Sequence, residues 1–358
     1  MPSKFTVQKD SDVKVEYDPK DMPFRRLGSS GLRVPLFSLG GWLTLGGTVT
    51  GDPVKDIIKT AFEHGINMFD TAEIYSNGKS EEEMGRAIKE LGYRRSDLII
   101  TSKLFWGVGR KEQNNGGLSR KHIIEGTLES LARLQTDYVD VLFAHRCDVN
   151  VPMVEIVRAF NYVIEQGWAF YWATSEWSAE QIEEAHHVAT ALNLIPPVAD
   201  QCQHKIKYNY GTTIFSSLYF GLLSGKYNSA TVPSDSRFAI EAAKDPEGHF
   251  GQIVRSLGEE KGKEMIRKVK EIGKLAESEC DLTFLSPSEF LTLPDHMNAG
   301  LNTTTPALAL AWVTLINPHT STVIMGVSKP EQLVENLKAV GLLGRLTEKW
   351  VFVSVNAQ

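Results

Sequence analysis

The stretch INMFDTAEIY, residues 66–75, decides the fold prediction, because an apolar run ends abruptly at Asp70 and a phenol follows at Tyr75. A short apolar run bounded by polar residues is typical of a buried strand. Two further runs repeat this pattern, since LIITSK ends at Lys103 and VDVLFAH ends at His145. We therefore expect buried strands whose ends carry functional side chains.

Working outward, we predict eight such strands, at 36–40, 67–70, 98–103, 139–145, 169–175, 198–203, 212–216 and 322–325. Amphipathic segments separate them, at 53–65, 80–92, 119–134, 152–167 and 178–193. In the third of these, Ile123, Leu128, Leu131 and Leu134 recur at helical spacing, and Ser119 is a candidate N-cap. Strands that alternate with helices indicate parallel pairing, and eight such units favour a closed (β/α)8 TIM barrel, an α/β fold.

The alternative fold is an open, doubly wound sheet. That fold normally carries a glycine fingerprint, GxGxxG, at its first turn. Neither LGGWLTLGG nor GVGRKE has the required spacing. A dinucleotide would therefore bind here without that motif.

The segments outside the strand and helix repeat set the domain boundaries. Residues 1–22 are polar and aperiodic, and we expect a flexible tail there. FRRLGSSGLRVP, 24–35, has a turn between two short runs and predicts a hairpin. We expect one barrel domain over 23–345 and a short divergent tail over 346–358.

Composition limits the partners. The chain has 358 residues, of which 42% are hydrophobic and 23% charged, with a formal net charge of −6. Without a dense Lys/Arg block, this balance argues against nucleic acid or anionic lipid as the main partner. A small-molecule substrate remains open.

The cysteines and the N-terminus suggest the compartment. Cys147, Cys202 and Cys280 are widely spaced and form no CxxC pair, which suggests neither a disulfide framework nor a metal site. The N-terminus has no apolar core of the kind found in signal peptides. The sequence also has no stretch of about 18 apolar residues, the length that a membrane-spanning helix needs. We expect an unprocessed cytoplasmic protein that does not insert into a membrane.

Four polar residues fall at the predicted strand ends and suggest catalysis: Asp70, Tyr75, Lys103 and His145. They suit the transfer of a proton to a carbonyl oxygen while a hydride reaches the carbonyl carbon. A phenol has a pKa of about 10, so a neighbouring ammonium would make it a better acid. Asp70 would keep Lys103 charged, and His145 would donate to the substrate oxygen.

Each of these residues also has an ordinary interpretation. Asp70 could cap a loop, Tyr75 could be a half-buried surface aromatic, and His145 could be a core histidine. Lys103 is harder to explain, because a lysine that ends an apolar strand is costly to bury without a partner. The combination at three successive strand ends favours the catalytic interpretation.

Longer motifs carry a resemblance to a known family. They are RRLGSSGLRVP, FDTAEIYSNGKSEEEMG, GLSRKHIIEGTLESLARLQTDYVDVLFAH, ATSEWS, GLLSGKY and GVSKPEQLVENLKA. From about Phe24 to about Ala339 the chain resembles the aldo-keto reductases. Within them it is similar to the branch with the beta subunits of voltage-gated potassium channels and their fungal relatives.

The resemblance implies a barrel that binds NADPH and reduces aldehydes or ketones, with Asp70, Tyr75, Lys103 and His145 as the catalytic residues. It also implies a homotetramer as the assembly. In animal channel subunits the last catalytic position is usually Asn. The histidine at 145 matches the more active reductases and favours turnover.

The cofactor positions follow from the same resemblance. Around the nicotinamide and the first loop it implies Gly41, Trp42, Leu43, Asp70, Ser175, Gln201 and Phe215. Around the pyrophosphate and phosphates it implies Ser216, Ser217, Leu218, Tyr219, Phe220, Gly221, Lys226 and Arg237. Around the 2′-phosphate and adenine it implies Gly326, Ser328, Gln332, Glu335 and Asn336.

The chain departs from the family pattern in several places. Only HKIKYNYG separates the strands expected before and after it, so the sixth barrel helix is expected to be missing and parallel pairing there to fail. We expect an irregular insertion at about 282–302. Ser217 replaces a usual proline, and Glu176 stands where channel subunits have Arg. An inward-pointing Glu176 would weaken cofactor binding.

Three other functions remain open beside reduction. The chain could be a channel-subunit-like interaction protein that uses bound cofactor as a redox signal. It could be a splice variant with impaired cofactor binding. It could also be a Schiff-base aldolase that acts through Lys103, in which case Asp70 and Tyr75 would be surplus.

Overall fold

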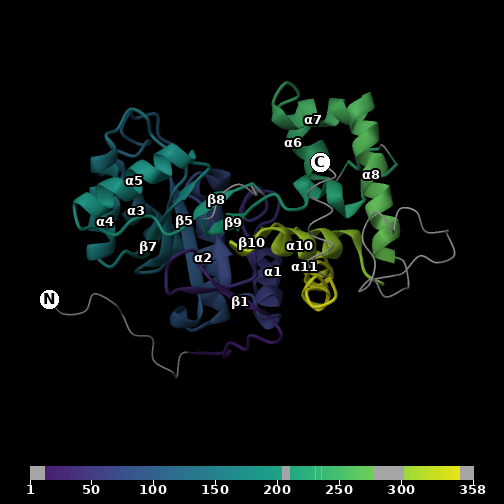
Figure 1. Ribbon diagram of the computed structural model, residues 1–358, viewed down its shortest axis with the longest axis horizontal. Helices are drawn as coiled ribbons and strands as arrows, with labels where there is room; N and C mark the ends of the chain where they lie inside the picture. The colour runs from purple at the N-terminus through teal and green to yellow at the C-terminus, as the bar shows by residue number, and fades with distance from the viewer. Residues whose placement is uncertain (1–12, 204–209, 230, 235, 278–301, 347–358) are drawn as a thin grey trace. The chain divides into compact units, whose positions relative to one another are not determined.

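The computed structural model describes residues 13–203, 210–229, 231–234, 236–277 and 302–346, and Figure 1 shows its elements. Eight parallel strands close into a barrel in the order β10-β3-β4-β5-β6-β7-β8-β9. The strands are β3 (Phe37–Gly40), β4 (Met68–Asp70), β5 (Ile99–Leu104), β6 (Val139–Ala144), β7 (Ala169–Ser175), β8 (Asp200–Cys202), β9 (Thr212–Ile214) and β10 (Thr320–Met325). All eight predicted strands are present. The (β/α)8 barrel is confirmed and the open-sheet alternative is wrong.

Helices follow the first five barrel strands as predicted. They are α1 (Asp52–Glu63), α2 (Lys79–Leu91), α3 (Arg120–Leu134), α4 (Met153–Glu165) and α5 (Ala179–Ala191). The N-cap at Ser119 is confirmed, because its side chain accepts a hydrogen bond from the His122 N–H at 3.2 Å. Side-chain caps of this kind satisfy amide groups that have no partner inside the helix.

The predicted apolar face of α3 is wrong at one position. Ile123, Leu131 and Leu134 are buried, whereas Leu128 is 44% exposed. The turn between 126 and 130 buries Gly126, Thr127 and Ser130 instead. Small residues therefore form part of the contact face, which apolar spacing alone cannot reveal.

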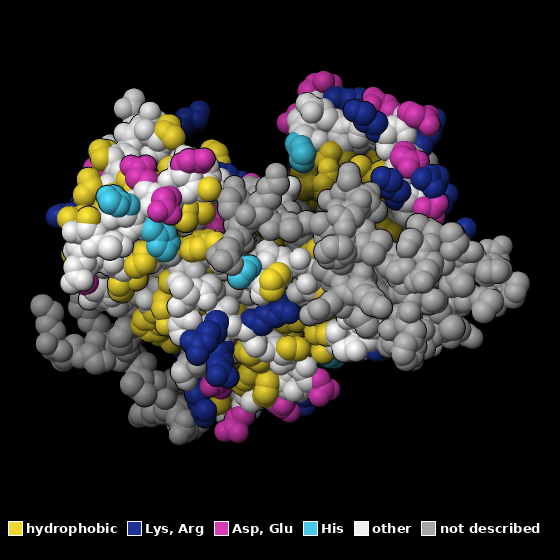
Figure 2. Space-filling model, viewed as in Figure 1, with side chains coloured by type: hydrophobic (Ala, Val, Ile, Leu, Met, Phe, Trp, Pro, Cys, Tyr) yellow, Lys and Arg dark blue, Asp and Glu magenta, His cyan; other side chains and the backbone are white. Residues whose placement is uncertain are grey.

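The predicted hairpin is confirmed as β1 (Phe24–Arg26) paired antiparallel with β2 (Arg33–Pro35). Leu27 and Val34 belong to one buried cluster with barrel residues such as Met68 and Ile99. This hairpin therefore supplies apolar side chains to the core near the start of the barrel strands. On the face shown in Figure 2, a group of basic side chains lies in the region of this hairpin.

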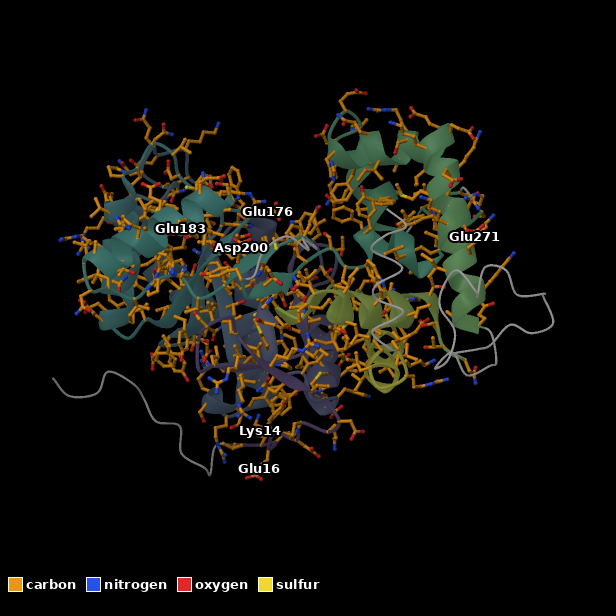
Figure 3. The ribbon with its side chains drawn as sticks, viewed as in Figure 1. Lys14, Glu16, Glu176, Glu183, Asp200 and Glu271 are labelled. Atoms are coloured by element: carbon orange, nitrogen blue, oxygen red, sulfur yellow. The ribbon has the colours of Figure 1, made fainter. Side chains whose placement is uncertain are left out.

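Part of the expected N-terminal tail is described by the structure and contacts the barrel unit. The Lys14 N–H donates to the Gly92 carbonyl at 3.0 Å, and Figure 3 labels Lys14 near the foot of the view. The Tyr17 hydroxyl donates to the Gly65 carbonyl at 2.7 Å. Residues 1–12 lie outside the described part of the chain.

The prediction that parallel pairing fails after β8 is wrong. β8 pairs with β9 in parallel, with Asp200 opposite Thr212 and Cys202 opposite Ile214. Thr212, Thr213 and Ile214 are fully or almost fully buried. Nine residues can span up to about 30 Å, which is long enough to join two parallel strands of three residues. The predicted absence of the sixth helix concerns mainly 204–209, which lie outside the described residues.

The chain divides into two compact units. One contains Met1–Phe215 with His319–Val334 and holds the whole barrel; the other contains Ser216–Pro318 with Glu335–Gln358. The second unit includes η4 (Tyr219–Ser224), α6 (Arg237–Lys244), α7 (His249–Leu257), α8 (Glu260–Glu277), α10 (Thr305–Ile316) and η7 (Val340–Leu342). It has a core of its own, in which Tyr227 stacks on Phe238 at 4.7 Å. Almost all of the predicted insertion and the C-terminal tail from 347 lie outside the described residues.

Among the helices that the structure describes, none is long and apolar enough to cross a membrane.

Candidate active site

The four predicted catalytic residues lie at the carboxyl ends of neighbouring strands. Asp70 is the last residue of β4, Lys103 is the penultimate residue of β5, and His145 directly follows β6. β4 pairs with β5, and β5 pairs with β6, so the three strand ends are adjacent. The carboxyl end of such a barrel is where side chains from several strands can converge on one substrate.

A buried ion pair forms the base of the site. The Lys103 ammonium lies 2.6 Å from Asp70 Oδ2, and the side chain of Lys103 is completely buried. The ammonium also donates to the Thr71 carbonyl at 2.7 Å. Burial alone lowers the pKa of Lys103, but attraction to Asp70 and to Tyr75 outweighs it and leaves the pKa raised. Lys103 is therefore a fixed positive charge.

Tyr75 is held over this pair by an unusual turn, η2 (Tyr75–Gly78). Ser76 and Asn77 both have positive φ, 49° and 54°, and Gly78 follows in the left-handed region. A run of left-handed residues is costly, and such backbone strain is found most often at functional sites. The YSNG sequence fits, since Asn and Gly tolerate this conformation best.

The phenol, the ammonium and the imidazole are neighbours. Lys103 Nζ lies 4.8 Å from the centre of the Tyr75 ring. The Tyr75 and His145 rings meet edge to face, with centroids 5.7 Å apart. Burial raises the pKa of Tyr75, and the Lys103 charge offsets only part of that rise. The lowering expected from the ammonium is present but smaller than the effect of burial, so the net pKa is raised and Tyr75 holds its proton at neutral pH.

His145 is neutral in this setting. Burial, together with the charges of Lys103 and Arg146, lowers its pKa from 6.5 to about 2. Its Nδ1 is buried and has no hydrogen-bond partner among the described residues. A neutral imidazole has one N–H to donate, so His145 can hydrogen-bond a carbonyl oxygen but cannot serve as a charged acid.

Two contacts of the site were not predicted from the sequence. Thr101 Oγ1 donates to Asp70 Oδ1 at 2.7 Å, which helps to orient the carboxylate. Alternation along β5 places Thr101 and Lys103 on the same face, and that signal could have found it. Arg146 follows His145 and donates to its carbonyl oxygen. Its proximity to His145 along the chain was the available signal.

The first set of predicted cofactor residues lies in the barrel unit, at or just beyond strand ends: Gly41, Trp42, Asp70, Ser175, Gln201 and Phe215. Gln201 Nε2 donates to Asp70 Oδ1 at 3.1 Å, and the Arg146 guanidinium donates to Ser175 Oγ at 3.4 Å. Gly41 donates its N–H to the Asp70 carbonyl at 2.8 Å. A Cβ on Gly41 would lie 2.4 Å from Ser80 Oγ, so only glycine fits this approach.

The pyrophosphate set lies in the second unit: Ser216, Ser217, Leu218, Gly221, Lys226 and Arg237. Within it, Ser216, Tyr219 and Phe220 have positive φ. A Cβ on Gly221 would come within 2.7 Å of Lys226 Nζ. The segment therefore bends closely around a lysine ammonium, which is a chemically suitable group for phosphate.

The adenine and 2′-phosphate set follows β10. Gly326, Ser328 and Gln332 belong to the barrel unit, whereas Glu335 and Asn336 belong to the second unit by the division above. The Ser328 N–H and hydroxyl both donate to Gln332 Oε1, at 2.9 and 3.2 Å. Both donors stand at the beginning of α11 (Pro330–Leu337). An anion bound there would replace Gln332 as their acceptor.

Glu176 does not point freely into the site. Its Oε1 accepts the Gln203 N–H at 2.8 Å, and its own N–H donates to the Gln201 carbonyl at 3.0 Å. Glu176 follows β7 and Asp200 begins β8, and Figure 3 labels both residues. The carboxylate is thus oriented by a backbone donor just after β8.

The described residues contain no group of three or more His, Cys, Asp or Glu that could hold a metal ion. A small cavity lies beside α3 and is lined by residues that include Arg110, Lys121 and His122. None of the four predicted catalytic residues lines this cavity. Its mixed charges favour no particular class of ligand.

The site thus combines a closed parallel barrel with a buried Asp–Lys pair beneath a tyrosine, at the strand ends where such barrels carry their active sites. The sequence pattern of the aldo/keto reductase family matches residues 37–351, and the chain belongs to that family. It is 48% identical to a Schizosaccharomyces pombe protein described as a voltage-gated potassium channel subunit beta, over 94% of this chain and 93% of that protein.

Two plant proteins with the same description are also similar. The chain is 42% identical to one from Arabidopsis thaliana, over 91% of this chain and 93% of that protein. It is 40% identical to one from Oryza sativa subsp. japonica, over 92% and 94%. The resemblance inferred from the motifs is thus confirmed over most of the chain.

Proposed function

We propose that this protein reduces aldehydes or ketones to alcohols with NADPH. The observation that carries the proposal is the buried Lys103–Asp70 pair, 2.6 Å long, with its ammonium 4.8 Å from the Tyr75 ring centre. A lysine buried without contact to water is costly unless it stabilises another charge. The charge that reduction creates nearby is the phenolate of Tyr75.

The chain's own residues supply the proton. Tyr75 gives its proton to the carbonyl oxygen and becomes a phenolate, which Lys103 stabilises at short range. Asp70 keeps Lys103 charged, and solvent restores the proton of Tyr75. General-acid catalysis of this kind contributes roughly a hundredfold to ten-thousandfold in rate. A bound NADPH would supply the hydride that reaches the carbonyl carbon.

His145 has a different role from Tyr75. Burial and the nearby charges of Lys103 and Arg146 together lower the pKa of His145 to about 2, so His145 stays neutral at working pH. It therefore hydrogen-bonds and orients the carbonyl oxygen while leaving the proton transfer to Tyr75.

The residues present fit a dinucleotide in several respects. Ser175 and Gln201 are buried polar groups at strand ends, suited to the carboxamide of a nicotinamide. Lys226, in the second unit, is suited to a phosphate, as are the donors of Ser328 in the barrel unit. We infer that the 2′-phosphate at this last position selects NADPH over NADH.

The Schiff-base alternative is disfavoured by the state of Lys103. A Schiff base requires a neutral amine, and burial is the usual means of obtaining one. Here Asp70 and Tyr75 leave the pKa of Lys103 raised despite burial. Lys103 is therefore a poor nucleophile.

The experiment is a titration of purified protein with NADPH, followed by tryptophan fluorescence, and then turnover with 4-nitrobenzaldehyde. The wild type should bind NADPH and reduce the aldehyde. Tyr75→Phe should bind NADPH equally well but reduce the aldehyde at least about a hundredfold more slowly. Tyr93→Phe is the control, because Tyr93 is also buried but stacks on Phe62 at 3.8 Å, outside the catalytic group.

Two results would overturn the proposal. Activity that survives Tyr75→Phe would remove the tyrosine from the mechanism. Failure of the wild type to bind NADPH would instead favour the splice-variant interpretation, with impaired cofactor binding.

A second candidate function rests on the relatives, which are described as potassium channel beta subunits. We infer that the chain could act in the cytoplasm as a homotetramer bound to a channel, with NADP(H) as a redox signal. Native mass spectrometry tests the tetramer, and co-purification with a channel protein tests the partner. A monomer that turns over aldehyde rapidly would argue for reduction alone.

A further inference from the structure

Glu73 is a buried carboxylate inside the loop that carries Tyr75, and the mechanism above does not use it. It is 1% exposed. Its Oε1 accepts the N–H of Phe105 at 2.7 Å and the N–H of Gly107 at 2.8 Å. The same oxygen lies 3.1 Å from Nε2 of His122. A buried carboxylate without such donors would cost several kcal/mol.

The donors come from the segment that leaves Lys103. Phe105 follows β5 directly, Gly107 lies two residues further on, and His122 lies in the first turn of α3. The backbone reinforces the link, because the Glu73 N–H donates to the Lys103 carbonyl at 3.1 Å. One residue therefore joins the Tyr75 loop, the end of the lysine strand and a barrel helix.

Gly126 of α3 leaves room for the buried pair formed by Glu73 and His122. A Cβ on Gly126 would lie 3.2 Å from Cε1 of His122 and 3.4 Å from Oε2 of Glu73. A side chain at this helix position would crowd both members of the pair. The glycine of α3 thus lets the carboxylate and the imidazole lie directly against the helix backbone.

The hydrogen bonds of Glu73 connect the segments that carry Tyr75 and Lys103. The two residues belong to different elements, a turn after β4 and the strand β5. The influence of an ammonium on a phenol falls with distance, and small displacements of catalytic groups reduce rates steeply. Glu73 lies two residues before Tyr75, and it accepts hydrogen bonds from residues two and four positions after Lys103. These bonds therefore restrain the distance between the phenol and the ammonium.

We propose that Glu73 is a positioning residue whose carboxylate fixes the Tyr75 loop against the segment following Lys103 and thereby sets the distance between phenol and ammonium. This inference rests on the proposed reductase function for its kinetic consequence. Its structural part, the placement of Tyr75 beside Lys103, can be measured without turnover.

A matched control exists in the same unit. Asp140 is also a buried carboxylate, and it accepts the Ile100 N–H and a guanidinium N–H of Arg95, both at 2.8 Å. It stands near the start of β6, whereas His145 follows the end of that strand. Asp140→Asn thus perturbs a comparable buried network at the opposite end of the barrel strands.

The kinetic test compares Glu73→Ala, Glu73→Gln and Asp140→Asn in reduction of 4-nitrobenzaldehyde. Glu73→Ala should lower kcat roughly tenfold to a hundredfold, because the acid is misplaced. Its loss of rate at alkaline pH should move to higher pH, since Tyr75 is farther from Lys103. Glu73→Gln keeps an oxygen acceptor and should recover most of kcat. Asp140→Asn should lower stability without moving the alkaline limit.

The second measurement uses the ¹³Cζ resonance of Tyr75 at pH 8, assigned by comparison with Tyr75→Phe. It should shift in Glu73→Ala and stay in place in Asp140→Asn. An unmoved resonance, or kcat and alkaline limit like those of the wild type, would overturn the positioning role. A shifted resonance in a protein whose wild type reduces no aldehyde would support the placement while contradicting the proposed function.

Discussion

Lys103 shows how one residue type at one place in a strand can point to a functional site. A lysine at the end of an apolar strand requires a partner, and the structure provides Asp70 at 2.6 Å. Desolvating both charges is expensive, and their attraction offsets the expense only while both are present. The pair therefore stabilises the fold only while both partners are present, whatever its proposed catalytic role.

Removal of one partner should be worse than removal of both. Lys103→Met leaves Asp70 as a buried, unpaired carboxylate and should lower the free energy of unfolding by about 3–5 kcal/mol. Adding Asp70→Asn to that variant should restore part of the loss. Urea denaturation of the two single variants and the double variant measures the coupling. Strictly additive losses would contradict a direct ion pair.

His145 should make the protein sensitive to acid. Its pKa is about 2 in the folded state, compared with 6.5 for the ordinary side chain. Below pH 6.5 the unfolded chain binds a proton that the native state excludes, so this stabilising contribution is complete above pH 6.5 and is lost as the pH falls. Between pH 7.5 and 5.5 the loss is about 1.4 kcal/mol.

His145→Asn should reduce that difference in the free energy of unfolding by about the same amount. Denaturant titrations at the two pH values measure it. His187→Asn is the control, because His187 is an exposed histidine on α5. An unchanged pH dependence in His145→Asn would show that the pKa of His145 is not lowered on folding.

The four candidate catalytic residues could be predicted because each stands at or just after a strand end, which sequence patterns locate well. Glu73 could not, since its role depends on partners from other elements. Thr101 and Arg146 were missed, although alternation along β5 and the position next to His145 were signals for them. The net pKa of Tyr75 was also beyond prediction. It depends on the degree of burial, which the residue types alone do not define.

At the scale of elements, periodicity predicted the strands and the first five barrel helices to within a few residues. It failed where the contact face was not apolar. α3 places Gly126, Thr127 and Ser130 against its neighbours and leaves Leu128 exposed. It also failed at the β8–β9 connection, because a rule for typical crossovers was applied to strands of only three residues.

Two leucines on the same helix provide a test of this assignment. Leu131→Ala should lower the free energy of unfolding by about 2–4 kcal/mol, because a 6% exposed side chain leaves a cavity. Leu128→Ala should cost less than about 1 kcal/mol, since that side chain is 44% exposed. Chemical denaturation ranks the two variants. Equal losses would contradict the orientation of α3.

At the scale of the whole molecule, the repeated strand and helix pattern predicted the barrel. The division into two compact units could not be predicted in that way, because α6, α7 and α8 of the second unit are amphipathic like α1, α2 and α4 of the barrel unit. The predicted cofactor residues belong to both units. The candidate catalytic group lies within one unit, whereas the complete cofactor set remains a prediction from family resemblance.

Hydrogen exchange with and without NADPH tests that set. Saturating NADPH should slow amide exchange in 216–221 and in 326–332, by up to about a hundredfold at a hundred times Kd. The β1–β2 hairpin is the internal control and should exchange as before. Protection confined to the barrel unit would remove the pyrophosphate residues of the second unit from the assignment.

The most direct test of the central claim is deuteride transfer from NADPH deuterated at C4 to 4-nitrobenzaldehyde. The account predicts deuterium on the carbinol carbon of the alcohol in the wild type. With Tyr75→Phe, the rate should fall at least about a hundredfold, because the acid is missing. Alcohol without deuterium, or an undiminished rate in that variant, would contradict hydride transfer coupled to protonation by Tyr75.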